Sequence, residues 1–393
     1  MNVSESLKLI AQGASQIIST EELEKKLQEG RPLRVKLGVD PTAPDIHLGH
    51  SVALEKLRQF QSLGHQAVLI IGDFTATVGD PTGRSVARPP ITREEVLANA
   101  KTYTQQAFKI LDESKTEIVY NGEWFRKMTY EEVLKLNARV TLQQMLQRED
   151  FKKRVKEGTP VSIHELQYPI MQGWDSVMVK SDVEIGGTDQ LFNNLVGREL
   201  QKAEGQSQQV VLLMPLLEGL DGVKKMSKSY GNYIGVNEAP NDMFGKIMSI
   251  SDDLMGRYYT LLLGETLDES QHPMDAKKAL AKSIVTRYHS ADLAEQALLN
   301  WESQFSKKDL ASSDLPELEI SLFDSTENLV QIVSLAYEQA FSIKRSNGDI
   351  KKQLIATGAI QLNETKLTDI HAKPELATGD VFKIGKKHAI RFK

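Results

Sequence analysis

The distribution of hydrophobic and polar positions predicts alternating strands and helices near the start of the chain. Residues 33–39 (LRVKLGV) have the composition of a strand, and residues 49–63 place apolar side chains on one helical face before Gly64. Residues 67–71 (AVLII) form an uninterrupted apolar run, as expected of a parallel strand covered on both faces. Strand, helix and strand in this order predict a βαβ unit.

A second set of the same signals lies further along the chain. A strand at 183–185, a helix at 191–204 and a buried strand at 209–217 are predicted, and residues 92–165 between the two sets are predicted to be mostly helical. The pattern therefore predicts an α/β fold, a doubly wound parallel-sheet (Rossmann-like) domain with a helical insertion. Its ligands should lie at the carboxyl ends of the strands.

The pattern divides the chain into three predicted domains. The Rossmann-like domain covers 1–240, with the helical insertion at about 120–165. A helical domain and a linker cover 241–325, since residues 306–326 are polar and lack periodicity. A small α+β domain covers 326–393.

Composition narrows the class of protein. The 393 residues contain no cysteine, which excludes disulfides, cysteine-ligated zinc and thiol catalysis. The polar start and the lack of a long apolar run predict a soluble cytoplasmic protein with no membrane association. The net charge is −5, but residues 341–393 carry eleven Lys or Arg against five acids, which leaves +6 there and −11 in the rest. This asymmetry suggests a polyanion contact, although a solvated lysine-rich surface explains it equally well.

The first motif with candidate chemistry is His47–His50 (HLGH). Its histidines are three residues apart at the predicted start of a helix, where free N–H groups and the helix dipole attract anions. Gly49 lets a flat base approach the backbone, and Thr42 in the preceding loop can donate to a phosphate. Taken alone, this is also the pattern of two surface histidines beside a glycine turn.

The second motif is Lys225–Ser229 (KMSKS), in a polar loop after the last predicted strand of the domain. Lysines are point-charge partners for a triphosphate, and a flexible loop delivers them when the transition state forms. A solvated basic loop is the alternative, which the presence of the first motif disfavours. The two motifs together predict an ATP site that stabilises charge on the phosphates.

Both motifs form the signature pair of class I aminoacyl-tRNA synthetases, and the chain resembles the bacterial tyrosyl-tRNA synthetases over essentially its whole length. Tyr168–Asp175 (YPIMQGWD) is similar to the tyrosine-pocket helix of that family. Gly186–Gln190 (GGTDQ) and Gly79–Gly83 (GDPTG) match further family segments, and residues 346–363 are similar to an S4-type RNA-binding module.

The resemblance implies a tyrosine site. Tyr168, Gln172 and Asp175 share one helical face; the first two, with Asp80, surround the ammonium. Asp175 accepts the phenolic hydrogen bond and so rejects phenylalanine, a selectivity for which tyrosyl-tRNA synthetases are the standard example. The tyrosine-binding residues implied are Asp40, Asp80, Tyr168, Gln172, Asp175 and Gln190.

The resemblance also implies two chemical steps. The tyrosine carboxylate attacks the α-phosphorus of ATP, and the terminal ribose hydroxyl of tRNA(Tyr) then attacks the adenylate; Mg²⁺ arrives with ATP, and no dedicated metal site or tightly bound cofactor is expected. The catalytic residues implied are Thr42, His47, His50, Lys225 and Lys228. The ATP-binding residues implied are Gly49, His50, Asp189, Lys225, Ser227, Lys228 and Ser229.

For the rest of the chain, the resemblance implies a helical anticodon-binding domain within 241–325 and an S4-like domain at 326–393. The insertion at about 120–165 would join two copies into a homodimer. The tRNA-binding residues implied are Lys344, Arg345, Lys351 and Lys352.

Two positions depart from the family pattern. Lys36 lies four residues before Asp40, where many members have a tyrosine that contacts the substrate hydroxyl. A lysine ammonium donates but cannot accept, so the second hydroxyl contact must be rearranged or absent. Arg84 occupies a position where lysine is common, which keeps the charge but changes the geometry.

Three alternatives remain at this point. A tryptophanyl-tRNA synthetase shares the fold and both motifs, but Asp175 and the S4-like end argue against it. A nucleotidylyltransferase uses a similar histidine loop but lacks the KMSKS segment. A non-catalytic RNA-binding protein would show eroded motifs.

Overall fold

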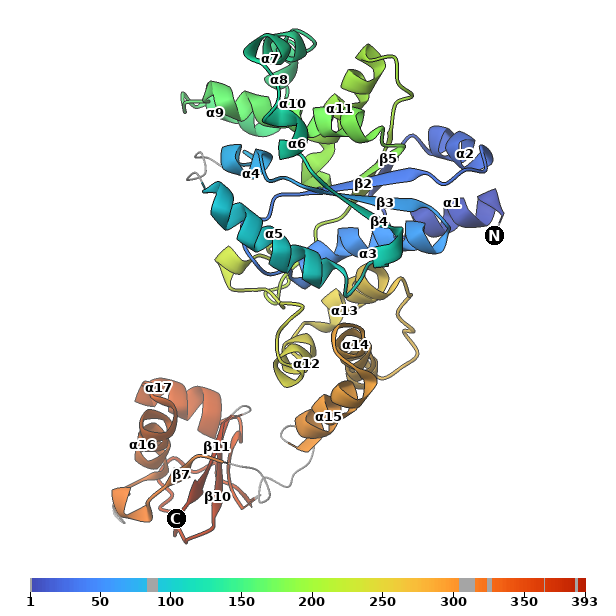
Figure 1. Cartoon of the computed structure of the whole chain (residues 1–393). Coiled ribbons are helices and arrows are strands. Elements are labelled where there is room, and N and C mark those ends of the chain that lie inside the picture. Colours follow the sequence, from blue (N-terminus) through green and yellow to red (C-terminus); the bar gives the residue numbers. More distant parts are fainter. Residues whose placement is uncertain (1, 83–90, 304–314, 324–326, 364, 386–387) are drawn as a thin grey trace. The chain divides into compact units, whose positions relative to one another are not determined.

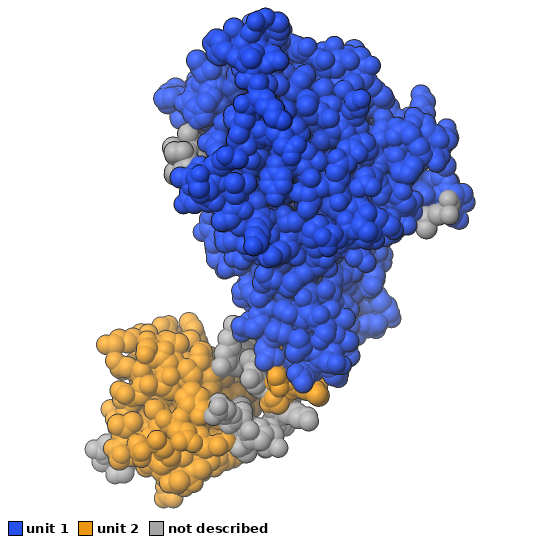
Figure 2. All heavy atoms as spheres, in the orientation of Figure 1, with its two compact units in different colours: residues 1–297 blue, residues 298–393 orange. Residues whose placement is uncertain are grey.

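The computed structural model describes residues 2–82, 91–303, 315–323, 327–363, 365–385 and 388–393 (Figure 1). Arg84, one of the two departures from the family pattern, lies outside these residues, as does Gly83. The chain forms two compact units, Met1–Ala297 and Leu298–Lys393, which are coloured separately in Figure 2.

The first unit begins with the elements that build most of the sheet. They are α1 (Val3–Ala11), β1 (Gln16–Ile18), α2 (Thr20–Gln28), β2 (Arg34–Val39), α3 (Leu48–Ser62), β3 (Gln66–Ile71), α4 (Thr75–Val78), α5 (Arg93–Ala107) and β4 (Thr116–Tyr120). The next elements carry the insertion and close the sheet. They are α6 (Gly122–Phe125), α7 (Tyr130–Asn137), α8 (Leu142–Met145), α9 (Glu149–Lys156), α10 (Ile163–Val179), β5 (Val183–Gly187), α11 (Leu191–Ala203) and β6 (Val210–Met214).

The six strands have the order β1-β6-β5-β2-β3-β4. All neighbours pair in parallel except β1, which runs antiparallel to β6 at one edge. Helices α3 and α5 lie on one face of the sheet, and α10 and α11 lie on the other (Figure 1). The chain leaves β2 toward β3 and β4 and returns to β5 on the other side of β2, so the topological switch point lies between β2 and β5.

The predicted doubly wound sheet is thus present, and most element bounds agree within one to three residues. The stretch 92–165 was predicted to be mostly helical and contains α5 to α9. The strand β4 within it was not predicted, although its Thr, Ile and Val favour a strand; it pairs with β3. The antiparallel strand β1 was not predicted either, because three residues carry too little periodicity.

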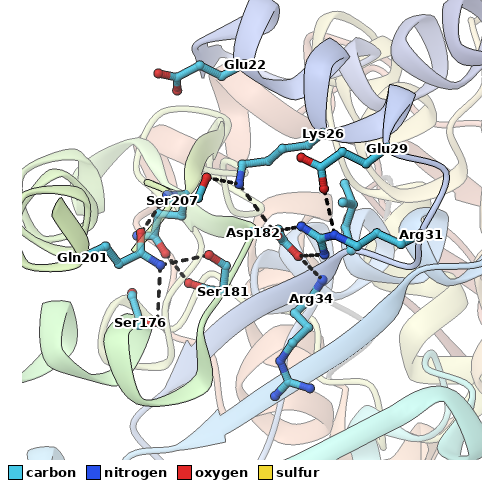
Figure 3. Close-up of polar contacts among 12 residues, drawn as sticks. Glu22, Lys26, Glu29, Arg31, Arg34, Ser176, Ser181, Asp182, Gln201 and Ser207 are labelled. Atoms are coloured by element: carbon cyan, nitrogen blue, oxygen red, sulfur yellow. Dashed lines mark hydrogen bonds and ion pairs between the residues drawn. The ribbon is translucent and has the colours of Figure 1, made fainter. Parts of the chain in front are cut away.

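A cluster of charged side chains lies at the amino ends of the central strands β2 and β5, opposite the carboxyl ends where the switch point lies. Asp182, just before β5, accepts hydrogen bonds from Nη1 and Nη2 of Arg31 at 2.7 and 2.6 Å (Figure 3). It also accepts from the ammonium of Lys26 at 3.3 Å and from the backbone N–H of Arg34 at 2.9 Å. These contacts join α2, the start of β2 and the start of β5. The two strands at the switch point are therefore held together at their amino ends.

Helices follow the sheet in the first unit. They are α12 (Pro240–Met248), α13 (Asp252–Tyr258), a π-helix (Tyr259–Leu263) and α14 (Pro273–Tyr288). Helix α15 (Ala291–Trp301) begins in the first unit and ends in the second. In the described part of the chain, no helix is both long enough and apolar enough to cross a bilayer.

The second unit is a small α+β fold. Its elements are β7 (Glu317–Leu318), α16 (Leu329–Phe341), α17 (Asn347–Asp349), a π-helix (Ile350–Ile355), β8 (Ile360–Leu362), β9 (Thr365–Lys366), β10 (Val381–Ile384) and β11 (Ala389–Phe392). The sheet has the order β7-β11-β10-β8-β9. Strand β7 lies within the stretch 306–326 that was predicted as linker; two residues cannot show periodicity, and pairing with β11 makes them a strand.

Candidate active site

Two adjoining cavities open at the carboxyl ends of β2 and β5. The inner cavity has a volume of about 260 Å³ and the outer one about 660 Å³. Gly38, Thr42, Asp80 and Gln190 line both of them. The cavities therefore form one continuous cleft at the switch point, where doubly wound sheets bind their ligands.

The HLGH segment forms the start of α3 on the wall of the outer cavity. The rings of His47 and His50 stack with centroids 3.8 Å apart, and the backbone N–H of His47 donates to Nδ1 of His50 at 3.3 Å. A Cβ on Gly49 would lie 3.0 Å from the His47 ring and 3.3 Å from Cβ of Met226. A side chain at this position would therefore crowd both His47 and the KMSKS residue Met226, whereas glycine leaves the backbone open.

Both imidazoles are held neutral. Burial above all, together with the neighbouring His50 and Lys228, lowers the pKa of His47 to about 2. Desolvation, together with the charges of Lys228 and Lys225, also lowers the pKa of His50. His50 is exposed to the open cleft, so solvent offsets part of this desolvation. Neutral imidazoles can donate hydrogen bonds to phosphate oxygens, and the positive charge of the site comes from the lysines.

The KMSKS lysines each contact a carboxylate on another segment. Lys225 Nζ lies 3.3 Å from Asp189, and Lys228 Nζ lies 3.0 Å from Asp45. Asn232 anchors this loop, because its Oδ1 accepts from the Ser227 N–H at 2.8 Å while its amide nitrogen bonds Asp221 at 2.9 Å. The loop thus has a fixed base and solvent-accessible lysine tips.

Two acids define one end of the inner cavity, and Asp40 is the first. Asp40 accepts from the Tyr168 hydroxyl at 2.9 Å and from Thr75 Oγ1 at 2.7 Å. A Cβ on Gly72 would lie 2.0 Å from Asp40 Oδ1, so only glycine leaves room for this carboxylate. Burial, together with the nearby acids, raises the pKa of Tyr168 well above its ordinary value, so this phenol stays protonated as a donor.

Asp80 is the second acid. It accepts from Gln190 Nε2 at 2.8 Å, from the Thr82 N–H at 2.9 Å and from Arg148 Nη2 at 3.2 Å. Asn193 continues this network, donating to Oε1 of Gln172 at 2.9 Å and to Oε1 of Gln190 at 3.0 Å. Two carboxylates and two oriented amides at one end of the cavity form a site for a cation.

Asp175 also lines the inner cavity and is connected to Asp40 through Asn121 and Thr75. Its two oxygens accept from Trp124 Nε1 at 3.1 Å and from Asn121 Nδ2 at 3.2 Å. The pKa of Asp175 is raised to about 7, because the effect of burial exceeds the opposing effects of Lys36, Asn121 and Trp124. A buried carboxylate with fixed partners is suited to accept one further hydrogen bond from a ligand.

The structure brings the predicted site residues together in two groups. All six predicted tyrosine-site residues line the inner cavity: Asp40, Asp80, Tyr168, Gln172, Asp175 and Gln190. Most of the predicted ATP and catalytic residues line the outer cavity: Thr42, His47, Gly49, His50, Asp189, Lys225, Ser227 and Ser229. Lys228 is not among the described lining residues of either cavity and points to Asp45 instead.

The predicted tRNA contacts lie in the second unit. Lys344, Lys351 and Lys352 are exposed, whereas Arg345 is half-buried with its guanidinium 4.8 Å from the centre of the Tyr337 ring. Among the described residues, no cluster of three or more histidine, aspartate or glutamate side chains is arranged to hold a metal ion.

Sequence reasoning missed several residues that form hydrogen bonds with the side chains of the inner cavity. Arg148 is in the insertion, and Asn121 and Trp124 follow β4, so no spacing in the sequence connects them with Asp80 or Asp175. Asn193 was within reach of prediction, since it lies one helical turn after Gln190.

Comparisons with known proteins agree with this geometry. Residues 28–306 match the family of class I tRNA synthetases (W and Y). The chain is 50% identical over 404 residues to the tyrosine–tRNA ligase of Carboxydothermus hydrogenoformans, an alignment that covers 98% of this chain and 97% of that protein. It is 48% identical over 398 residues to the tyrosine–tRNA ligase of Aquifex aeolicus, covering 100% and 99% of the two chains.

Solved structures share the fold. The tyrosyl-tRNA synthetase of Archaeoglobus fulgidus, crystallised with L-tyrosine, has a TM-score of 0.61 at 26% identity, covering 76% of this chain and all of that one. The truncated mitochondrial tyrosyl-tRNA synthetase of Aspergillus nidulans has a TM-score of 0.63 at 22% identity, covering 77% of this chain and 94% of that one.

Proposed function

The chain belongs to the class I tRNA synthetases (W and Y), and we propose that its two adjoining cavities carry out the tyrosine–tRNA ligase reaction. It activates L-tyrosine with ATP and transfers the tyrosyl group to the 3′-terminal ribose of tRNA(Tyr), releasing AMP and pyrophosphate. The tryptophan and nucleotidylyltransferase alternatives are not favoured by relatives of this identity and coverage.

The observation that carries the proposal is that one cavity is lined both by the acids Asp40 and Asp80 and by the buried Asp175. The ammonium of tyrosine lies between Asp40 and Asp80, near Tyr168 and Gln172, where the two negative charges compensate it. The phenolic hydroxyl of tyrosine reaches Asp175 and donates a hydrogen bond to its carboxylate. Phenylalanine would leave this buried carboxylate without that bond, which disfavours its binding.

ATP occupies the outer cavity. Thr42 and the neutral imidazoles of His47 and His50 donate to the phosphates, and Asp189 accepts from the ribose when Lys225 leaves it. Lys225 and Lys228 stabilise the charge that develops as the tyrosine carboxylate attacks the α-phosphorus and pyrophosphate departs. No protein nucleophile is needed, since placement and charge stabilisation suffice. Mg²⁺ enters with ATP as part of the substrate.

Further residues that line the outer cavity contact the adenosine and the phosphates of ATP. The backbone at Gly49 faces the adenosine, and Ser227 and Ser229 hold the loop against the phosphates. Gln190, whose amide bridges Asp80 and Asn193, lies beside the tyrosine carboxylate.

The remaining parts of the chain bind tRNA. Residues 241–325 serve as the anticodon-binding domain with its linker, and residues 326–393 as an S4-like domain. The exposed ammonium groups of Lys344, Lys351 and Lys352, with Arg345 beside them, support a phosphate-backbone contact there. Charging of tRNA takes place in the cytoplasm.

We also propose a homodimer through the insertion. Several large apolar side chains of α7 to α10 are exposed to solvent: Tyr130 (78%), Leu134 (50%), Leu142 (57%), Val155 (54%) and Ile163 (78%). Exposed apolar side chains gathered on one set of helices are typical of a protein interface.

Exchange of pyrophosphate into ATP tests the function, measured in parallel with tyrosine, tryptophan and phenylalanine. Tyrosine alone should support rapid exchange, followed by charging of tRNA(Tyr). A preparation of the Lys225→Ala, Lys228→Ala variant serves as the control for contaminating host enzyme. Exchange that depends on tryptophan rather than tyrosine would contradict the proposal.

A further inference from the structure

Lys36 is buried in the middle of β2, directly behind the inner cavity. Its side chain is 0% exposed, and its ammonium donates to Ser176 Oγ at 2.7 Å, to the Gln172 carbonyl at 2.9 Å and to Glu184 Oε1 at 2.9 Å. An ammonium has three hydrogens. All three donors of Lys36 are therefore used within the protein.

This arrangement excludes Lys36 as a direct ligand of the substrate hydroxyl. Lys36 is not among the described residues that line either cavity, whereas Gln172, Asp175 and Glu184 line the inner one. A lysine at this position does not replace the family tyrosine as a second hydroxyl contact. It acts on the residues between itself and the cavity.

The three acceptors belong to two elements that enclose the tyrosine site. Gln172 and Ser176 lie one helical turn apart on α10 and bracket Asp175. Glu184 on β5 accepts from Gln172 Nε2 at 3.3 Å and from Ser176 Oγ at 3.1 Å, in addition to Lys36. The ion pair of Lys36 and Glu184 thus ties one turn of α10 to the two central strands of the sheet.

A second layer supports this clamp from behind. Gln201 on α11 donates to the carbonyls of Ser176 at 3.4 Å and Ser181 at 2.9 Å (Figure 3). Gln209 donates to Glu184 through its Nε2 and accepts from the Ser181 hydroxyl. The turn of α10 that carries Gln172 and Asp175 is therefore bonded to β2 and β5 on one side and to α11 on the other.

We propose that Lys36 is a positioning residue for tyrosine binding, which clamps the Gln172–Ser176 turn to Glu184 and so places Gln172 and Asp175 without touching the substrate. The inference rests on the proposed tyrosine site. Gln172 serves the amino end of the substrate, and Asp175 serves the phenol. A loosened clamp therefore weakens binding of every amino acid that uses the amino end, phenylalanine included.

The Lys36→Met, Glu184→Gln double variant tests this inference. It removes both charges at once, and such exchanges of a buried ion pair are often tolerated in folding. The KM for tyrosine in pyrophosphate exchange should rise between about tenfold and a hundredfold, the range that displaced positioning groups produce. The inhibition constant of phenylalanine should rise as well, while the KM for ATP stays at the wild-type value.

Two further variants separate positioning from general stability. Ser176→Ala removes one acceptor, keeps both charges, and should raise the KM for tyrosine about twofold to threefold. Lys277→Met is the matched control, because this buried lysine bonds the Ile250 carbonyl at 2.7 Å and Asp252 at 2.6 Å, away from both cavities. It should lower the melting temperature and leave the KM for tyrosine unchanged.

The outcomes are distinct. A double variant with wild-type KM for tyrosine, or with only a reduced fraction of active enzyme, overturns the inference. A rise for tyrosine without a rise for phenylalanine overturns it too, because that pattern requires a direct contact with the hydroxyl. Failure of the wild type to exchange with tyrosine would instead reject the proposed function.

Discussion

The ammonium of Lys225 lies 3.3 Å from the carboxylate of Asp189, and both residues line the outer cavity. Lys228 has the same kind of partner in Asp45, at 3.0 Å. Each lysine is partly exposed, so these pairs contribute little to stability and are easily exchanged for phosphate oxygens. In the proposed reaction, the phosphate oxygens of ATP replace these carboxylates as the partners of the KMSKS lysines.

Removal of either lysine should slow adenylate formation more than it weakens tyrosine binding. We expect Lys225→Ala or Lys228→Ala to reduce kcat of pyrophosphate exchange about a hundredfold to a thousandfold, as for other groups that stabilise transition-state charge. The KM for tyrosine should change by less than about threefold, because the inner cavity is intact. Lys224→Ala, next to the motif, is the control. A large effect on the KM for tyrosine with little effect on kcat would contradict the assignment.

Asp175→Asn should reduce selectivity for tyrosine over phenylalanine. The amide keeps the volume and one acceptor but loses the charge, and hydrogen bonds to charged groups are worth about 1.5–3 kcal/mol, or roughly tenfold to a hundredfold in the ratio of kcat/KM values. The ratio is measured by exchange with each amino acid. Unchanged selectivity would place hydroxyl recognition elsewhere in the cavity.

The same substitution should change the dependence of stability on pH. Burial raises the pKa of Asp175 from 3.8 to about 7, so the folded protein holds this proton more tightly than the unfolded chain does. Its destabilising effect is absent below pH 3.8, grows as pH rises toward about 7, and is then constant at a few kcal/mol by linkage, with ~1.4 kcal/mol per pH unit.

Asp175→Asn removes that effect. The melting temperature of the variant relative to the wild type should therefore increase from pH 5 to pH 8, as followed by circular dichroism. Asp112→Asn is a suitable comparison, because hydrogen bonds from Ser114 lower the pKa of that exposed carboxylate. A difference between the Asp175 variant and wild type that is the same at both pH values would contradict an elevated pKa.

Truncation after about residue 325 should separate the two steps of the reaction. Both cavities lie within Met1–Ala297, so exchange with tyrosine should remain within about twofold of the full chain. Charging of tRNA(Tyr) should fall strongly, because the exposed lysines of the second unit are removed. Equal loss of both activities, with an unchanged melting temperature, would contradict the tRNA-binding assignment.

Ile163→Glu should weaken the homodimer. Ile163 is 78% exposed at the start of α10, and a carboxylate there would have to be desolvated on association. Sedimentation velocity should show a monomer at concentrations where the wild type is dimeric. The control is Val223→Glu, since Val223 is 82% exposed and lies outside the insertion. A monomeric wild type would contradict the proposed interface.

Local patterns were sufficient to predict the framework of the fold. Strands β3 and β6 are apolar runs, β2 and β5 place Val, Leu or Ile at alternate positions, and α3 and α11 have helical periodicity. Each of these elements could therefore be recognised within its own few residues. The edge strands β1 and β7 could not, because two or three residues show no periodicity and owe their conformation to the neighbours with which they pair.

The sequence by itself determined the chemistry of the outer cavity and the helical face of Tyr168, Gln172 and Asp175, because motif identity and the period of a helix are local properties. Only the tertiary structure decided what surrounds them. Lys36 and Glu184 are 148 residues apart and form a buried ion pair, and their contact depends on the parallel pairing of β2 with β5. The role of Lys36 thus follows from the acceptors that the fold places around its ammonium, and residue type alone could not reveal it.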